Sequence, residues 1–158
     1  MISPGGFGKT FVFQVLAAKI RSEDGIVLNV ATTGLAAQNL IGGRTAHSRF
    51  KIPIPIQEDS TCSIKAQSDI AKLLRENKLI VLDEIFSCHR YNVEAVDRTL
   101  RDIIQIDELF GSKVVCLAED PRQTLPIVKR GGRDSIVNAF IQMSPIFPQF
   151  KQIYLTRT

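Results

Sequence analysis

A glycine-rich segment near the start of the chain carries residue types that bind phosphate. Residues 3–10 read Ser-Pro-Gly-Gly-Phe-Gly-Lys-Thr, which matches the P-loop pattern G-x-x-x-x-G-K-[ST] except at the first glycine, where Ser3 stands. In a P-loop, backbone N–H groups surround a phosphate at a helix N-terminus, a lysine reaches the β and γ phosphates, and a hydroxyl binds Mg²⁺. The pattern predicts a nucleotide site made by Gly5, Gly6, Gly8, Lys9 and Thr10, with Thr10 on the metal. A flexible glycine turn before an ordinary amphipathic helix is the alternative interpretation.

Two adjacent carboxylates follow an apolar run downstream. Residues 79–84 read Leu-Ile-Val-Leu-Asp-Glu, the Walker B arrangement. A parallel strand delivers its last residues to the carboxyl edge of the sheet, where a P-loop also opens. We therefore expect Asp83 to hold Mg²⁺ and Glu84 to orient and deprotonate the attacking water. Two solvated acids at a strand end are the alternative, but the Gly-Lys-Thr segment upstream favours the catalytic interpretation.

A further apolar run, residues 114–117, leads directly into polar residues. The amide of Gln123 is a candidate sensor of the γ-phosphate, and Asp120 and Arg122 are candidates for anchoring a switch to a neighbouring domain. A polar loop after a strand is common, so the pattern alone is weak.

Apolar runs and helical periodicity alternate along the chain. Continuous apolar strands are expected at 26–30, 79–82, 114–117 and, more weakly, 152–155, which indicates a parallel sheet covered on both faces. Helices are expected at 9–21, 35–41, 70–76, 93–106 and 135–143, and residues 50–63 are expected to form an extended loop. The alternation predicts an α/β doubly wound domain. Asp97, Arg98, Arg101 and Asp102 alternate in sign along one helix and indicate an ion-pair surface.

Length and composition narrow the class of protein. The 158 residues fit one domain, and 44% hydrophobic with 23% charged residues is typical of a globular protein without a membrane span. The start of the chain has no signal or transit pattern, so an intracellular location is expected. A net charge of +4 permits a polyanion partner without requiring one. Three widely spaced cysteines argue against a disulfide framework and against a zinc site.

The chain resembles the PIF family of superfamily-one DNA helicases, named for petite integration frequency. The resemblance covers nearly the whole chain and rests on the P-loop and on these blocks: 31–37, 42–53, 60–62, 82–84, 94–102, 122–123 and 125–126. It implies a RecA-like P-loop domain that hydrolyses ATP with Mg²⁺ and moves five-prime to three-prime on single-stranded DNA. It further implies a role in DNA repair, recombination and telomere maintenance, in the nucleus or mitochondrion. By the same resemblance, Lys9, Glu84 and Gln123 are the catalytic residues.

The resemblance also implies where single-stranded DNA is bound. Thr32, Thr33 and Gly34 precede a predicted helix, and their hydroxyl and N–H groups form a seat for a phosphate. A second group of donors resembles the family's single-strand channel and consists of Arg44, Thr45, His47 and Ser48. A polar loop that simply caps a helix is the alternative for this second group.

The sequence departs from the family pattern at several places. Only Met1 and Ile2 precede Ser3, so the strand before the P-loop is expected to be missing, and a second motor domain is expected only in a longer version. Residues 118–119 are usually a glycine pair, Pro121 is usually aromatic, and residues 85–86 are usually Ala-Pro. These changes leave a second hypothesis open, a catalytically decayed nucleotide- or DNA-binding module from a diverged or mobile-element copy. A chain that does not fold alone is the third.

Overall fold

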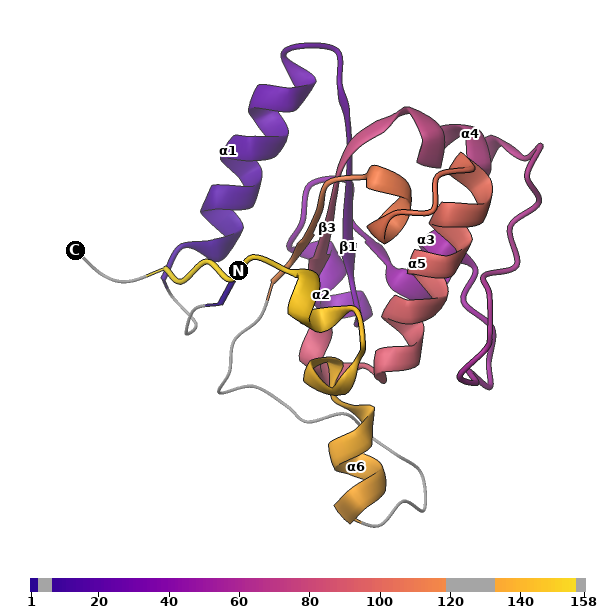
Figure 1. Ribbon diagram of the computed structural model, residues 1–158. Helices are drawn as coiled ribbons and strands as arrows, with labels where there is room; N and C mark the ends of the chain where they lie inside the picture. The colour runs from indigo at the N-terminus through magenta and orange to yellow at the C-terminus, as the bar shows by residue number, and fades with distance from the viewer. Residues whose placement is uncertain (3–6, 119–132, 156–158) are drawn as a thin grey trace.

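A parallel sheet forms the centre of the molecule (Figure 1). The computed structural model describes residues 1–2, 7–118 and 133–155. Within these residues four strands pair in the order β2-β1-β3-β4, and every neighbouring pair is parallel. The strands are β1 (Ile26–Ala31), β2 (Arg44–Thr45), β3 (Asn77–Asp83) and β4 (Val115–Leu117). The predicted α/β class with a mainly parallel sheet is confirmed.

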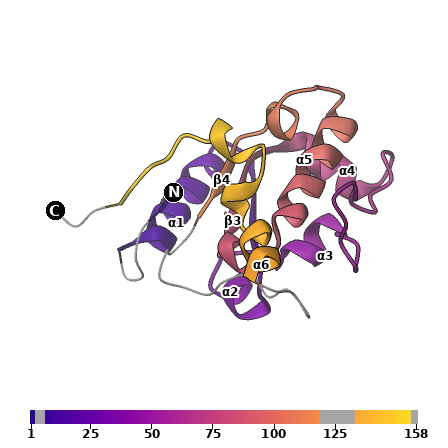
Figure 2. The same cartoon turned by 60° about the horizontal axis from the view of Figure 1, so that its bottom comes forward.

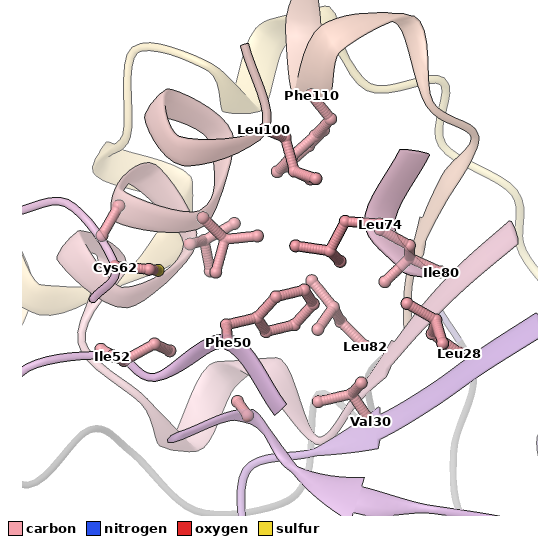
Figure 3. Close-up of a cluster of buried hydrophobic side chains, with 14 of the residues drawn as sticks. Leu28, Val30, Phe50, Ile52, Cys62, Leu74, Ile80, Leu82, Leu100 and Phe110 are labelled. Atoms are coloured by element: carbon pink, nitrogen blue, oxygen red, sulfur yellow. The ribbon is translucent and has the colours of Figure 1, made fainter. Parts of the chain in front are cut away.

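Successive side chains of the two central strands enter different hydrophobic clusters. Leu28 and Ile80 point into the larger cluster, where Phe50, Leu74 and Leu100 meet them (Figure 3). Because strand side chains alternate between the two faces, the residues between them reach the opposite cluster. Each central strand is therefore buried on both faces, which explains the continuous apolar runs of the sequence.

Helices cover the two faces of the sheet (Figure 1). On one face lies α1 (Lys9–Arg21), whose Phe13 and Ala17 complete the smaller cluster. On the other face lie α3 (Ala46–Phe50), α4 (Asp69–Glu76) and α5 (Arg90–Ile104). The short α2 (Gly34–Gln38) follows β1, and α6 (Arg133–Ala139) extends away from the sheet. No helix in the described ranges is both long and apolar enough to cross a bilayer.

Short 3-10 turns separate several of these elements: η1 (Ile85–Ser87), η2 (Leu109–Ser112), η3 (Ile141–Met143) and η4 (Phe147–Gln149). The helix expected at 135–143 is thus two elements, since Phe140 takes an extended conformation with ψ 143° between them. The helix expected at 35–41 already ends at Gln38. Two elements were not predicted at all, β2 and α3, because neither is long enough to show a periodicity.

The charged residues of α5 are more buried than the sequence indicates. Asp97 is 5% exposed, and its carboxylate accepts hydrogen bonds from Arg101 Nε at 3.0 Å and from Phe110 N at 2.6 Å. Glu94, also 5% exposed, accepts from Arg90 at 3.1 Å and from the Ser144 hydroxyl at 2.6 Å. The predicted ion pair exists, but the expectation of a surface is wrong for Asp97, which fixes the turn at Phe110.

The outer side of β4 is only partly covered. Ile2 forms a single parallel bridge to Tyr154, and the amino group of Met1 donates a 2.5 Å hydrogen bond to Leu117 O. A cavity of about 340 Å³ lies beside them, between β4 and residues 150–153. The strand expected at 152–155 is thus reduced, among the described residues, to the bridge at Tyr154. The first and last described residues lie close together (Figure 2).

Candidate active site at the carboxyl edge of the sheet

The first turn of α1 carries two of the predicted nucleotide-binding residues. Gly8 caps the helix with φ 86°, a left-handed conformation that favours glycine, and its carbonyl accepts from Val12 N at 3.0 Å. Lys9 and Thr10 follow at once and are half-buried. A helix N-terminus has free N–H groups and a partial positive charge, which suits a phosphate. The P-loop pattern thus correctly places the glycine where the backbone requires one.

Asp83 ends β3 and lies in register with Ala31, the last residue of β1. Its Oδ1 accepts a 3.0 Å hydrogen bond from Glu84 N. Burial raises the pKa of the Asp83 carboxyl above its ordinary value, whereas this hydrogen bond and the positive charge of Lys9 oppose the rise. The Lys9 ammonium therefore acts electrostatically on Asp83, which brings the two motifs into one site. A carboxylate and the Thr10 hydroxyl are the hard oxygen ligands that Mg²⁺ takes.

Glu84 leaves the strand in an unusual conformation. Its φ of 56° and ψ of 37° are left-handed, a region that costs a residue with a Cβ about 1–2 kcal/mol. The Glu84 carbonyl accepts hydrogen bonds from Thr32 Oγ1 at 3.0 Å and from Ser87 Oγ at 2.8 Å. Its carboxylate oxygen Oε2 accepts from Thr33 Oγ1 at 3.3 Å. Two residues predicted to contact DNA are therefore in contact with the predicted general base.

The segment after β1 is built as the sequence predicts, with a helix that begins just beyond two threonines. Thr33 is exposed, and its hydroxyl accepts a 3.2 Å hydrogen bond from Ala36 N, which caps α2. Gly34 is exposed as well and begins the helix. Thr32 is half-buried, and its hydroxyl lies 2.6 Å from Ser87 Oγ. Thr33 and Gly34 thus face solvent, whereas Thr32 turns toward Glu84.

The second predicted group reaches the same edge through β2. Arg44 and Thr45 pair with Val30 and Ala31, so they lie beside the end of β1. Thr45 Oγ1 accepts a 3.3 Å hydrogen bond from Ser48 N and caps α3, as the capping alternative expected. The remaining members keep outward positions: Arg44 and Ser48 are exposed, and His47 is half-buried. The two groups, separated in sequence, are therefore neighbours in space.

An open hollow of about 480 Å³ joins these groups. Thr32, Thr33 and His47 line it together with residues that sequence reasoning did not select: Ile54, Ile56, Ser87, His89 and Asn92. The Ile54 side chain is 83% exposed, so an apolar surface borders the polar groups. None of these residues belongs to a pattern with a known chemistry. The only feature of the sequence that could have pointed to these lining residues is their position, shortly after the Walker B residues or in the Pro-containing loop.

Other positions add to the electrostatics of this edge. Burial lowers the pKa of Arg49, and the positive charge of Arg44 lowers it further. Burial and the charge of Arg90 lower the pKa of His89. Several predicted site residues lie outside the described residues: Gly5, Gly6 and Gln123, together with Asp120 and Arg122 of the expected switch.

The glycine-capped helix, the Asp83–Glu84 pair and the parallel sheet together define a RecA-like P-loop nucleotide-binding domain. The family model of PIF1-like helicases matches residues 2–158, and the chain belongs to that family. A curated relative is the ATP-dependent DNA helicase Pif1 of Psychrobacter sp. (strain PRwf-1), 28% identical over 153 residues. The ATP-dependent DNA helicase PIF4 of Trypanosoma brucei brucei (strain 927/4 GUTat10.1) is 31% identical over 100 residues, which are 61% of this chain and 12% of that protein.

Solved structures give the same result. Bacteroides Pif1 bound to single-stranded DNA is 29% identical with a TM-score of 0.82, and the similarity covers 99% of this chain and 37% of that one. Bacteroides Pif1 in complex with ADP-AlF3 and single-stranded DNA is 30% identical with a TM-score of 0.83, over 99% and 37% of the two chains. The match with the Psychrobacter helicase covers 96% of this chain but only 23% of that protein.

Proposed function

We propose that this chain is the ATP-binding and ATP-hydrolysing front part of a DNA helicase motor. In this proposal Lys9 contacts the β and γ phosphates, Thr10 and Asp83 ligate Mg²⁺, and Glu84 deprotonates the attacking water. Mg²⁺ would supply charge neutralisation between the phosphates. The observation that carries the proposal is that a helix with a left-handed glycine cap, followed at once by Lys9 and Thr10, stands beside a sheet whose strand β3 ends in Asp83 and Glu84. The solved relative with ADP-AlF3 supports it.

Calorimetric titration with ATP and Mg²⁺ tests the nucleotide site. Lys9→Ala should weaken binding at least tenfold, because it removes the cation that meets the phosphates. Lys19→Ala is the matched control, since Lys19 lies at the far end of α1 in an exposed pair with Glu23. Equal affinity in the wild type and Lys9→Ala would remove the case for a working P-loop.

Turnover measurements test the assigned base. Glu84→Gln should leave binding of ATP nearly intact and lower hydrolysis by about 10²- to 10⁴-fold, the usual contribution of a general base. Turnover of the isolated chain should itself be low, because in two-domain motors the second domain supplies arginines worth about 10³- to 10⁵-fold. Unchanged hydrolysis in Glu84→Gln would show that another group takes the proton.

We also propose that the edge around Thr33, Gly34, Arg44, Thr45, His47 and Ser48 binds single-stranded DNA, with Thr32 holding the neighbouring backbone. Two solved relatives are complexes with single-stranded DNA. The neighbouring charges of Arg44 and Arg49 favour a phosphate backbone, and the hollow bordered by Ile54 offers an apolar surface to bases. Affinity for an oligothymidylate should fall steeply as salt rises. Arg44→Ala should reduce the slope of log affinity against log salt concentration by about one. A salt-independent affinity would contradict this assignment.

The wider biological role is proposed from membership of the same family. We propose action in DNA repair, recombination and telomere maintenance, in the nucleus or mitochondrion, as part of a protein that includes a second motor domain. Forked-duplex unwinding measured on the purified 158-residue chain tests the motor proposal. Strand separation needs two domains that open and close on ATP, so the expected result is no unwinding. Robust ATP-dependent strand release by this chain alone would contradict it.

A further inference from the structure

One hydroxyl group joins the DNA-facing loop to the catalytic carboxylate. Thr33 Oγ1 donates to Glu84 Oε2 at 3.3 Å and at the same time accepts from Ala36 N at 3.2 Å. A hydroxyl has one proton to donate, so while Thr33 holds Glu84 it has no proton for a phosphate oxygen. Thr33 and Glu84 are 51 residues apart in sequence, and the pairing of β1 with β3 brings them together.

The backbone of Glu84 is held by two neighbouring hydroxyl groups, one from the DNA-facing loop and one from η1. Its carbonyl accepts hydrogen bonds from Thr32 Oγ1 and Ser87 Oγ, and these two hydroxyl groups lie 2.6 Å apart. These bonds offset the cost of the left-handed backbone at Glu84. The backbone of the residue is therefore fixed, and the carboxylate is the part that is free to change partner.

The direction of this contact matters for catalysis. In the sheet, β1 lies on one side of β3 and β4 on the other, and Met1, which precedes the P-loop in sequence, donates a hydrogen bond to Leu117 of β4. By bonding to Thr33 just beyond the end of β1, one carboxylate oxygen of Glu84 is held on the side of β3 opposite to β4. A base must lie within about 2.6–3.2 Å of the proton that it takes, directly or through one water.

We propose that Thr33 is a positioning residue that holds Glu84 in an inactive orientation until single-stranded DNA takes its hydroxyl. A DNA phosphate oxygen at Thr33 accepts the proton now donated to Glu84, and the released carboxylate turns toward the attacking water. No covalent step is involved. The proposal rests on the proposed function, since it assigns a regulator to the same base, and it makes hydrolysis dependent on DNA within this domain.

A double-mutant cycle on DNA binding tests the proposal without any need for turnover. The affinity of the 158-residue chain for a short oligothymidylate is measured for wild type, Thr33→Val, Glu84→Ala and the double variant. Glu84→Ala should tighten binding about 3- to 10-fold in the wild-type background, because DNA no longer competes for the hydroxyl. In the Thr33→Val background, Glu84→Ala should tighten DNA binding about 3- to 10-fold less than it does in the wild-type background. A gain of equal size in both backgrounds reflects charge removal alone and would overturn the proposal.

Turnover gives a second readout, expressed as the ratio of rates with and without saturating oligothymidylate. Thr33→Val and Thr33→Asp should raise the DNA-free rate about 3- to 10-fold and lower the ratio, since neither side chain can donate to Glu84. Thr33→Asp still caps α2, so it separates the lost donor from a lost cap. Thr33→Ser retains the donor and should restore the wild-type ratio.

The controls distinguish this proposal from the proposed function. Ser68→Ala removes a comparable cap, from α4, far from Glu84, and should leave the ratio unchanged. Circular dichroism confirms that each variant is folded. If wild type does not bind ATP in a Lys9-dependent way, the proposed function fails. If ATP binds as expected but the effects at Thr33 and Glu84 are additive, only the coupling proposed here fails. If ATP binds but no oligothymidylate binds, the proposed DNA-binding edge fails together with the coupling.

Discussion

The two sides of the sheet are held together very differently. The central strands β1 and β3 pair along their length from Ile26 to Ala31, and their side chains are buried on both faces. Beyond β4, by contrast, the described residues show only an isolated bridge between Ile2 and Tyr154, next to a cavity of about 340 Å³. Asp83 and Glu84 therefore follow a firmly held strand, whereas Ile2, which precedes the P-loop in sequence, is held by a single bridge. The backbone that carries the proposed base is thus built on the well-packed half.

The largest expected effect comes from a cavity at the centre. Ile80 is fully buried in β3, so Ile80→Ala should lower the free energy of unfolding by about 2–5 kcal/mol. Val114, just before β4, is 63% exposed, and Val114→Ala should cost less than about 0.5 kcal/mol. Urea unfolding followed by circular dichroism measures both. Similar losses at the two positions would show that the two sides are equally well packed.

A pH effect of intermediate size should distinguish the cysteines of the two regions. Burial raises the pKa of the Cys62 thiol to about 11, from an ordinary value of 9.0. Between pH 9 and 11 the unfolded chain loses this proton while the folded chain keeps it, so the free energy of unfolding falls as pH rises. The loss reaches about 2–3 kcal/mol at most. Unfolding under reducing conditions from pH 8 to 11 measures it.

Variants at the two cysteines test which thiol causes the fall in the free energy of unfolding with pH. Cys62→Ala should flatten the pH dependence, since the buried titrating group is gone. Burial also raises the pKa of Cys116 on β4, whereas the positive charge of the nearby chain terminus opposes the rise, and Cys116→Ala should flatten the pH dependence to a smaller extent. A slope unaffected by Cys62→Ala would mean that other groups, such as lysines, account for the alkaline loss of stability.

The smallest expected effect is at the loosely held edge itself. Ile2 is half-buried, and it is fixed by hydrogen bonds to Ile153 O at 2.8 Å and from Leu155 N at 3.1 Å. Ile2→Ala keeps both backbone bonds and removes only part of a side chain, so it should cost about 0.5–1 kcal/mol. A cost as large as that of Ile80→Ala in the same urea titration would mean that this edge is as important to stability as the central strands.

The sequence predicted best those elements whose signal is local. Helix α1 was predicted with the bounds that it has, because Gly8 marks its start and apolar spacing continues to Arg21. The central strands were predicted as apolar runs, since burial on both faces demands them. By contrast, Arg44–Thr45 form β2 only because β1 is available as a partner, and no window of five residues reveals α3.

The candidate site shows the same division. Lys9, Thr10, Asp83 and Glu84 belong to motifs, and their types and spacing predicted them. The contact between Thr33 and Glu84 depends on strand register and on two side-chain rotamers, which sequence spacing does not determine. The hollow that includes His89 and Ile54 depends on the path of a loop, and it was missed for the same reason.

Every strand pair of this sheet is parallel, so no local hairpin can begin its formation. Val30 must find Leu82 across an intervening short strand and three helices, and Ile2 pairs with Tyr154 from the opposite end of the described residues. Non-local pairing of this kind slows folding, because loop-closure entropy is lost before contacts compensate for it. Until the late bridge at Ile2 forms, the edge of β4 remains open to pairing with other chains, and molecular chaperones should therefore raise the yield of folded protein.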